Sequence, residues 1–404
     1  MATCTFAEAR ALVLSKVLLE VVASRQPRVE SVALAEADGR VLAAGILAER
    51  DYPPLARSIR DGYGVRAKDL QGALPGELEV IGEVAAGGYF TGTVGAGQCV
   101  EIMTGAPVPA GVDAVVMVEY TMREGARMWT DKSPQPGDFI NPRAAEVKAG
   151  ATVLRAGRRL GFAEIAMAAT VGCTEVPVFR KPRVAILSTG DEVVPVEQTP
   201  EPNQVRNSNA WSLAVQVKRA GGEPHMLPVA RDTYADTLRL VEQGLQHDLL
   251  LLSGGVSAGK YDVVERVLAD CGAEFFFDRV LIQPGQPVVF GRARDKFFFG
   301  LPGNPASTMV TFELFGKAAV ELLSGQSESP LITPFAQLTH DFHHRKGLTG
   351  FLPALLSEDC QKVTHVRWQG SSDVPALSHA NAFLVAGADR EEWKAGDWIQ
   401  VLLR

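Results

Sequence analysis

The first 25 residues carry apolar positions at helical spacing. These positions are Phe6, Ala9, Val13, Val17, Leu18 and Val21. Charged residues lie between them, which is the pattern of an amphipathic helix rather than of a signal peptide. The chain contains no run of 18 or more apolar residues, so no membrane span is expected.

Residues 51–150 show a different pattern, because apolar and polar residues alternate between glycine and proline turns. The segments 76–87 (GELEVIGEVAAG) and 112–120 (VDAVVMVEY) are examples. Such alternation predicts the strands of a small β-domain. The apolar stretch 161–171 predicts a helix that returns to pack beside the N-terminal one.

Residues 181–324 alternate short apolar runs with amphipathic ones. Strands are expected at 183–188, 225–230, 248–253, 287–290 and 296–301, and helices at 209–220, 234–245, 262–270 and from about 306. Asn209 is the expected N-cap of the first of these helices, and Gly221 is its expected stop. Strands that alternate with helices predict an α/β domain with three layers and a mainly parallel sheet.

The last 80 residues return to short strands, which end in 382–389 (AFLVAGAD) and 397–404 (DWIQVLLR). We therefore expect four domains. They are a helical linker domain from residues 1–50 and 151–180, a β-domain at 51–150, the central α/β domain at 181–324, and a C-terminal β-domain at 325–404.

Composition narrows the possible partners. The net charge of −7 argues against binding nucleic acid or anionic membranes through bulk electrostatics. The cysteines are odd in number, widely spaced and without a C-x-x-C pair: Cys4, Cys99, Cys173, Cys271 and Cys360. This pattern is typical of free thiols in a reducing compartment and predicts a cytoplasmic protein.

Candidate chemistry follows the expected strands, because ligands of an open parallel sheet bind outside the carboxyl ends of its strands. The loop 253–259 (SGGVSAG) contains three glycines and two serines, Ser253 and Ser257 among them. It suits either an anion held by backbone N–H groups or a tight turn between strand and helix. Phosphate binding gains support from Asp262, three residues beyond the last glycine.

Four acids come from separate loops of this edge: Asp191, Glu192, Asp232 and Asp262. Carboxylates that converge beside a phosphate require a cation, and Mg²⁺ binds one or two carboxylates together with phosphate oxygens. Any one of them alone is better explained as a helix cap or a surface acid. All four at strand ends favour a cation.

Two further segments are candidates. Pro302-Gly303-Asn304-Pro305 forms a rigid turn before a helix, and Ser307 lies in the first turn of that helix, where an oxyanion could dock; turn rigidity alone also explains the motif. In the β-domain, Arg57 and Arg60 belong to a charged loop that suits an anionic substrate or is a surface hairpin. The pair His343-His344 has no partner at metal-ligand spacing, so both are expected to be surface residues.

These motifs together resemble one family, over essentially the whole chain. The segments that carry the resemblance are SIRDGYGVR (58–66), IMTGAPVPAGVDAVV (102–116), LSTGDEVV (187–194), NSN (207–209), GGVSAGKYD (254–262), QPGQPVVFG (283–291) and GLPGNPAS (300–307). The chain resembles the molybdopterin molybdenumtransferases, which include the bacterial MoeA proteins and the gephyrin E-domain. The resemblance implies insertion of molybdate into adenylated molybdopterin, with release of AMP, formation of molybdenum cofactor and use of Mg²⁺.

The resemblance also implies site residues. The acids of functional weight would be Asp61, Glu192, Asp232 and Asp262, with Asp232 and Asp262 as metal ligands. The expected substrate-binding residues are Thr189, Gly190, Asp191, Ser253, Gly254, Gly255, Ser257, Pro302, Gly303, Asn304, Pro305, Ser307, Arg57 and Arg60.

The resemblance implies an elongated homodimer in which each cleft lies between the α/β domain of one subunit and the β-domain of the other. Asp61 should then be far from Asp262 within one chain and near it only across the dimer. Expected protein partners are the molybdopterin adenylyltransferase and apo-molybdoenzymes.

The sequence departs from the family pattern at three places. Arg60 stands before Asp61, Ala144-Ala145-Glu146 replaces a Gly-Glu-Asp or Gly-Ser-Asp motif, and Gln283-Pro284-Gly285-Gln286 replaces Lys-Pro-Gly-Lys. The two glutamines favour an alternative function, a non-catalytic carrier of molybdopterin or finished cofactor. The retained acids favour the enzyme. A receptor-binding scaffold, as in the gephyrin E-domain, has no specific support in the sequence.

Overall fold

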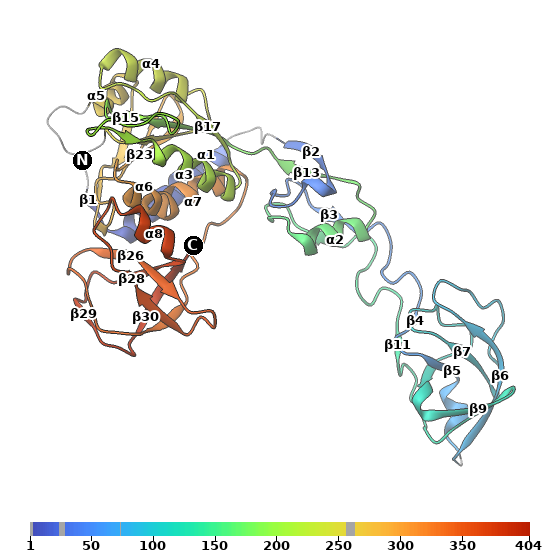
Figure 1. The fold of residues 1–404 in the computed structure, drawn as a ribbon. Coiled ribbons are helices and arrows are strands. Elements are labelled where there is room, and N and C mark those ends of the chain that lie inside the picture. The colour runs from blue at the N-terminus through green and yellow to red at the C-terminus, as the bar shows by residue number, and fades with distance from the viewer. Residues whose placement is uncertain (1–2, 24–28, 73, 256–262) are drawn as a thin grey trace. The chain divides into compact units, whose positions relative to one another are not determined.

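The computed structural model describes residues 3–23, 29–72, 74–255 and 263–404 (Figure 1). It divides into two compact units. One contains residues 1–44, 156–161 and 175–404, and the other contains residues 45–155 and 162–174. Within the described ranges, no helix is both long and apolar enough to cross a membrane.

The first unit is built on a mixed six-stranded sheet. Its order is β17 (Glu223–Met226), β14 (Arg183–Ser188), β18 (Leu249–Ser253), β23 (Lys296–Leu301), β22 (Val289–Ala293) and β19 (Glu274–Phe277). Parallel pairing joins β17 through β23, whereas β22 and β19 are antiparallel to their neighbours. The strands expected at 183–188, 248–253 and 296–301 are confirmed within one residue, while the other two are displaced by two residues or more.

Helices cover both faces of this sheet (Figure 1). Ala185 and Leu250 point to one face, where they share a buried cluster with α4 (Tyr234–Gly244) and α5 (Val263–Asp270). Val184 and Leu249 point to the other face, against α1 (Phe6–Ala23), α3 (Ser208–Arg219), α6 (Pro305–Thr311) and α7 (Lys317–Leu323). Successive side chains of a strand alternate in direction, so continuous apolar runs such as 249–252 serve both layers.

The N-cap of α3 differs from the expected one. Asn207, and not Asn209, caps the helix, and its side chain accepts a hydrogen bond from the Ala210 N–H at 3.1 Å. The motif contains two asparagines, and the side chain of Asn209 instead donates hydrogen bonds to Ser253 and Gly303. The expected stop is confirmed, since Gly221 adopts a φ of +91°, which an L side chain rarely adopts.

The N-terminal helix packs within the first unit. α1 lies against α7, and its fully buried Ala9 and Val13 share a core cluster with Ala318 and Ala319. The helix expected at 161–171 is present as α2 (Phe162–Thr170), but it contacts β12 (Thr152–Leu154) in the second unit. Arg10 fixes α1 further by donating to the Leu314 carbonyl at 2.5 Å, inside the π-helical turn Phe312–Gly316.

The stretch expected to be a helical linker also contains strands. β2 (Val29–Ala33) pairs antiparallel with β13 (Glu175–Phe179) in the first unit. β3 (Ile46–Leu47) pairs with β12 in the second unit. In each pair, a strand from residues 29–47 lies beside a strand from residues 152–179. The chain therefore leaves and re-enters each unit through adjacent strands.

The second unit carries a six-stranded β-sheet. Its order is β8 (Ala114–Met117), β5 (Gly62–Val65), β7 (Gln98–Ile102), β6 (Gly76–Val84), β10 (Arg127–Thr130) and β9 (Thr121–Glu124). Gly62 shows why the motif needs a glycine here, because a Cβ at this position would lie 2.0 Å from the Val116 carbonyl oxygen. The short strands β4 (Arg57–Ser58) and β11 (Ile140–Asn141) pair antiparallel with each other. The charged loop begins in β4, so this pairing fixes its first residues.

The C-terminal strands form a closed barrel. The order is β26 (Thr349–Leu356), β27 (Lys362–His365), β24 (Phe335–Leu338), β30 (Trp398–Leu403) and β28 (Ala382–Ala386), and β28 pairs back to β26. A sixth strand from the central region, β21 (Ile282–Gln283), pairs in parallel with β26. The strands expected at the end of the chain are thereby confirmed as β28 and β30. Closure removes exposed sheet edges, which stabilises so small a β-domain.

Candidate functional site

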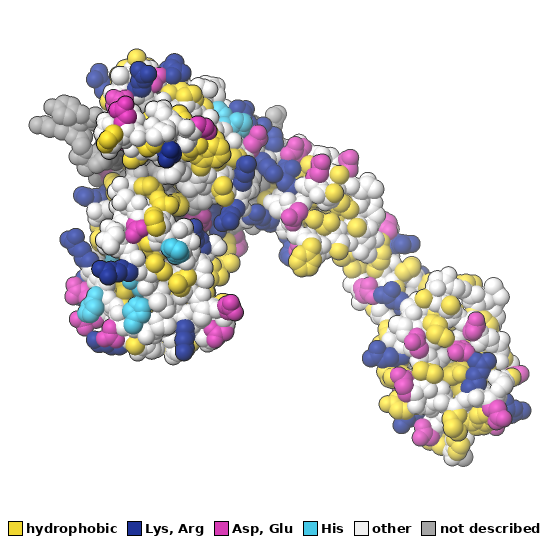
Figure 2. Space-filling view, in the orientation of Figure 1, with side chains coloured by type: hydrophobic (Ala, Val, Ile, Leu, Met, Phe, Trp, Pro, Cys, Tyr) yellow, Lys and Arg dark blue, Asp and Glu magenta, His cyan; other side chains and the backbone are white. Residues whose placement is uncertain are grey.

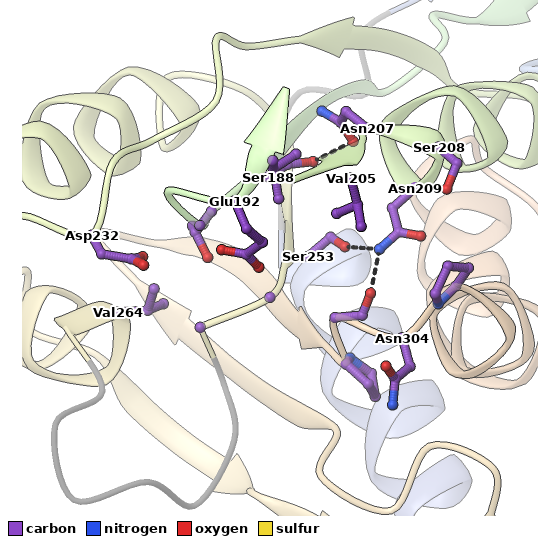
Figure 3. Close-up of a pocket in the computed structure, with 18 of the residues that line it drawn as sticks. Ser188, Glu192, Val205, Asn207, Ser208, Asn209, Asp232, Ser253, Val264 and Asn304 are labelled. Atoms are coloured by element: carbon purple, nitrogen blue, oxygen red, sulfur yellow. Dashed lines mark hydrogen bonds between the residues drawn. The ribbon is translucent and has the colours of Figure 1, made fainter. Parts of the chain in front are cut away.

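A cavity of about 1080 Å³ lies at the carboxyl ends of β14, β18 and β23 (Figure 3). All of its lining residues belong to the first unit. They are Ser188, Thr189, Gly190, Glu192, Val193, Val205, Arg206, Asn207, Ser208, Asn209, Asp232, Thr237, Ser253, Gly254, Gly255, Val263, Val264, Pro287, Pro302, Gly303, Asn304, Pro305 and Ser372. The position agrees with the rule that open parallel sheets bind ligands at this edge.

The start of the glycine-rich loop packs directly on the end of β14. Gly254 and Gly255 adopt φ values of +91° and +64°. A Cβ on Gly254 would lie 2.9 Å from the Thr189 carbonyl oxygen, and one on Gly255 would lie 2.6 Å from Val264 Cγ2. Only glycine fits both positions, so backbone groups form this wall. Ser257 and Asp262 lie outside the described residues, and their predicted roles stay predictions.

Two of the predicted acids face the cavity, and a third is hydrogen-bonded to one of them. Glu192 and Asp232 line the wall, whereas Asp191 does not. The Asp191 N–H donates to Asp232 Oδ2 at 3.4 Å, and the Asp232 N–H donates to Asp191 Oδ1 at 3.2 Å. The loops that carry Asp191 and Asp232 thus hold each other in place. Glu192 and Asp232 present their carboxylates to the cavity (Figure 3).

The opposite end of the cavity is built from amides and hydroxyls. Asn209 Nδ2 donates to Ser253 Oγ and to the Gly303 carbonyl, both at 2.8 Å, and so joins three loops (Figure 3). Asn207 Oδ1 accepts from Ser188 Oγ at 3.0 Å. Sequence reasoning missed both asparagines as site residues. The available signal was the motif 207–209, a polar cluster at the start of a helix near the sheet edge.

The turn 302–305 forms a further wall, together with a segment of the C-terminal region. Asn304 Nδ2 donates to Ser371 Oγ at 2.8 Å, and the Ala306 N–H donates to the Ser371 carbonyl at 2.9 Å. Ser372 lines the cavity beside them. Ser307 is buried and is not among the lining residues, and Ser371 already occupies the adjacent helix N–H. An oxyanion contact of Ser307 therefore stays a prediction.

The charged loop of the second unit is held by its own hydrogen bonds. Asp61 Oδ1 accepts from the Thr104 N–H at 2.6 Å and from Thr104 Oγ1 at 2.8 Å, which lowers the pKa of this exposed carboxyl. Arg57 forms an ion pair with Glu146, which also accepts from Asn141 Nδ2 at 3.1 Å. Arg60 is exposed. The predicted separation of Asp61 and Asp262 stays a prediction, since Asp262 lies outside the described residues.

The histidine pair is only half as expected. His343 is exposed, but His344 is 8% exposed, and its Nε2 lies 3.0 Å from the Leu348 carbonyl oxygen. Burial lowers the pKa of the His344 imidazole. Neighbouring residues of an extended segment point in opposite directions, so the two could not both face solvent. Among the residues that the structure describes, no three His, Cys, Asp or Glu side chains are grouped to hold a metal ion.

Fold and cavity together define a class, an α/β domain with a polar cavity at the carboxyl ends of its strands. Models of three protein families match successive parts of the chain. They are the MoeA N-terminal region (domain I and II) at residues 4–172, a probable molybdopterin binding domain at 185–322, and the MoeA C-terminal region (domain IV) at 336–403.

Curated relatives cover nearly the whole length. The chain is 35% identical to a molybdopterin molybdenumtransferase of Staphylococcus epidermidis, over 92% of this chain and 90% of the relative. Identity to the Bacillus subtilis protein of that name is also 35%, over 94% and 90%. The crystal structure of a molybdopterin biosynthesis MoeA protein from Pyrococcus horikoshii is 28% identical, with a TM-score of 0.83 over 100% of both chains. The chain belongs to the MoeA family of molybdopterin molybdenumtransferases.

Proposed function

We propose that this protein inserts molybdate into adenylated molybdopterin, releasing AMP and forming molybdenum cofactor. The observation that carries the proposal is the two-ended cavity. One end presents the carboxylates of Glu192 and Asp232 beside a glycine turn, and the other presents amides and hydroxyls around Asn209. A nucleotide-tagged heterocycle needs both kinds of wall, a place for phosphate with a cation and a set of hydrogen-bonding groups.

Unpaired polar atoms support a bound ligand. In the described part of the chain, Asn209 Oδ1 and Thr189 Oγ1 are buried without a hydrogen-bond partner. Buried polar groups in folded proteins almost always have partners, so such atoms in a cavity wall favour a missing hydrogen-bonding ligand. Asn209 Oδ1 would accept from a ring N–H of the substrate, and Thr189 Oγ1 would donate to a substrate oxygen.

Mg²⁺ would be held jointly by protein and substrate. Glu192 and Asp232 give two carboxylates, with Asp262 as the further expected ligand, and Mg²⁺ commonly takes one or two carboxylates plus phosphate oxygens and water. The bound cation supplies charge neutralisation at the phosphates. The residues hold and orient it, and Asp191 keeps Asp232 in position. Chelation should abolish activity, and added Mg²⁺ should also tighten substrate binding in the absence of molybdate.

The homodimer is the proposed working assembly in a cytoplasmic pathway. Asp61 of one subunit would complete the cleft of its partner, and Arg57 and Arg60 would supply positive charge that Gln283 and Gln286 lack. Mixing an Asp61→Ala subunit with an Asp262→Ala subunit should restore partial activity, because one of the two clefts in the mixed dimer is intact. Mixed dimers that stay inactive would exclude the shared cleft. The molybdopterin adenylyltransferase and apo-molybdoenzymes remain the proposed protein partners.

One assay tests the function against the carrier alternative. The full-length protein is incubated with adenylated molybdopterin and Mg²⁺, with and without molybdate, and AMP is quantified. The enzyme should release AMP in a molybdate-dependent manner. A carrier would bind the substrate and release none, and that result would reject the proposal.

A further inference from the structure

The cavity wall carries little positive charge for a phosphate-bearing substrate. Glu192 and Asp232 contribute two negative charges, and among the lining residues that the structure describes Arg206 is the one Lys or Arg side chain. Carboxylates repel an approaching anion, and a bound Mg²⁺ would offset the charge of these two carboxylates but leave the charge of the phosphate itself without a cationic side chain. A charge-assisted contact between a phosphate and a side chain of the described wall therefore depends on Arg206.

The backbone places Arg206 between the two ends of the cavity. It ends β16 (Val205–Arg206), which pairs in parallel with β15 (Val193–Val194), directly after Glu192. The next residue, Asn207, is fixed by its hydrogen bonds to Ser188 and to the Ala210 N–H. Figure 3 shows Val205 between Glu192 on one side and Asn209 on the other. The strand is thus anchored at the residue that follows Arg206.

The guanidinium itself is tethered on one side only. Arg206 Nε donates to the Gln198 carbonyl at 3.1 Å, and the residue is exposed. Among the described residues, no carboxylate forms an ion pair with the terminal Nη groups of Arg206, whereas those of Arg57 are paired with Glu146. A guanidinium held at Nε presents its two Nη groups as a fork, the geometry that matches two oxygens of a phosphate.

We propose that Arg206 is the phosphate-binding side chain of the cavity and contacts the phosphate of the adenylated substrate. This inference rests on the proposed function and assigns a substrate contact to a residue outside the predicted site. In the chain Arg206 follows Glu192 and directly precedes the amides of the 207–209 motif, so it would bind the charged middle of a ligand whose ends occupy the two halves of the cavity. It acts in binding, not in bond cleavage.

Equilibrium binding of adenylated molybdopterin to the full-length protein, without molybdate so that no AMP is released, tests the inference. Arg206→Gln should weaken binding roughly tenfold or more, because it removes a charge-assisted hydrogen bond. Arg206→Lys keeps the charge and loses the fork, so its loss should be smaller. Arg231→Gln is the matched control, since it removes the same charge from an exposed residue that does not line the cavity, and its affinity should equal that of the wild type.

The outcomes separate this inference from the proposed function. Wild-type protein that releases no AMP would reject the function. If the wild type releases AMP and Arg206→Gln binds the substrate as tightly as Arg231→Gln does, the phosphate contact is wrong. A raised half-saturating molybdate concentration with unchanged substrate affinity would assign Arg206 to molybdate and also overturn it. Equal losses in the Gln and Lys variants, with lowered thermal stability in both, would show a structural tether to Gln198 instead.

Discussion

The α/β cavity and the charged loop of the β-domain hold their functional groups in opposite ways. In the cavity, hydrogen bonds link separate loops, as Asn209 links Ser253 to Gly303, and some buried polar atoms remain without partners. In the loop, Asp61 and Arg57 are already satisfied by Thr104 and Glu146 at the surface. The first arrangement leaves hydrogen-bonding groups available for a ligand. The second leaves Asp61 and Arg57 already paired, and under the proposed dimer they would act on the partner's cleft.

The strongest test of this contrast compares Asp191 and Asp232, whose loops are joined by reciprocal hydrogen bonds. Asp232→Asn removes a carboxylate that lines the cavity, whereas Asp191→Asn removes one that only accepts a backbone N–H. We expect kcat for AMP release to fall about a hundredfold for Asp232→Asn, because a negative charge at the proposed cation and phosphate site is lost. Asp191→Asn should reduce it much less.

Folding should not explain the difference between these two variants. Both residues are exposed, and each amide can still accept the reciprocal hydrogen bond, so the free energy of unfolding should change by less than about 0.5 kcal/mol. Equal kcat values for the two variants would mean that lining the cavity does not distinguish an acid that takes part in the reaction from one that does not.

A second test concerns the network that joins the loops. Asn209→Ala removes the donor to Ser253 Oγ and the Gly303 carbonyl, leaving two acceptors in a part-buried site. We expect a loss of about 1–3 kcal/mol in the free energy of unfolding, measured by denaturant titration, and a raised KM for adenylated molybdopterin. Ser208→Ala is the control, since Ser208 is exposed and should change stability by less than about 0.5 kcal/mol. Similar stability of the two variants would show that the network is not structural.

The predictability of the two regions from sequence also differs. Apolar runs such as 249–252 identified the central strands, and the rule about strand ends placed Glu192, Asp232 and Gly254 at one cavity. The roles within the motif 207–209 were not predictable, because both asparagines suit an N-cap and only tertiary packing assigns Asn209 to the loops. The packing of α1 on α7 was missed for a similar reason, since an amphipathic pattern gives the buried face but not its partner.

A third test examines whether the hydrogen bonds of Thr104 to Asp61 stabilise the folded protein. Hydrogen bonds from Thr104 lower the pKa of Asp61 in the folded state below its ordinary value of 3.8. The stabilising contribution is therefore complete above pH 3.8 and is lost as the pH falls through the lower folded-state value. Asp61→Asn should unfold more easily than the wild type near neutral pH, and the difference should shrink as the solution is acidified. A difference that is independent of pH would contradict this.

The smallest expected effect lies in the turn that follows β11 in the second unit. Ala144 has a φ of +61°, a conformation that favours glycine, and its N–H donates to the Pro53 carbonyl at 3.0 Å. Ala144→Gly should stabilise the protein by about 0.5 kcal/mol, because relief of strain exceeds the added flexibility of the unfolded chain. Ala145→Gly, without positive φ, should destabilise it by about 0.5–1 kcal/mol. Thermal unfolding of both variants measures the effects. If Ala144→Gly does not stabilise the protein, Ala144 is not strained.

The most direct measurement is the ratio of molybdenum transferred to AMP released in one reaction of the wild-type protein with adenylated molybdopterin, Mg²⁺ and molybdate. Molybdenum in the pterin product is determined by elemental analysis and AMP by chromatography. A molybdenumtransferase that uses this cavity should produce the two in equal amounts, and neither without molybdate. AMP release without metal transfer, or metal binding without AMP release, would contradict the proposed function.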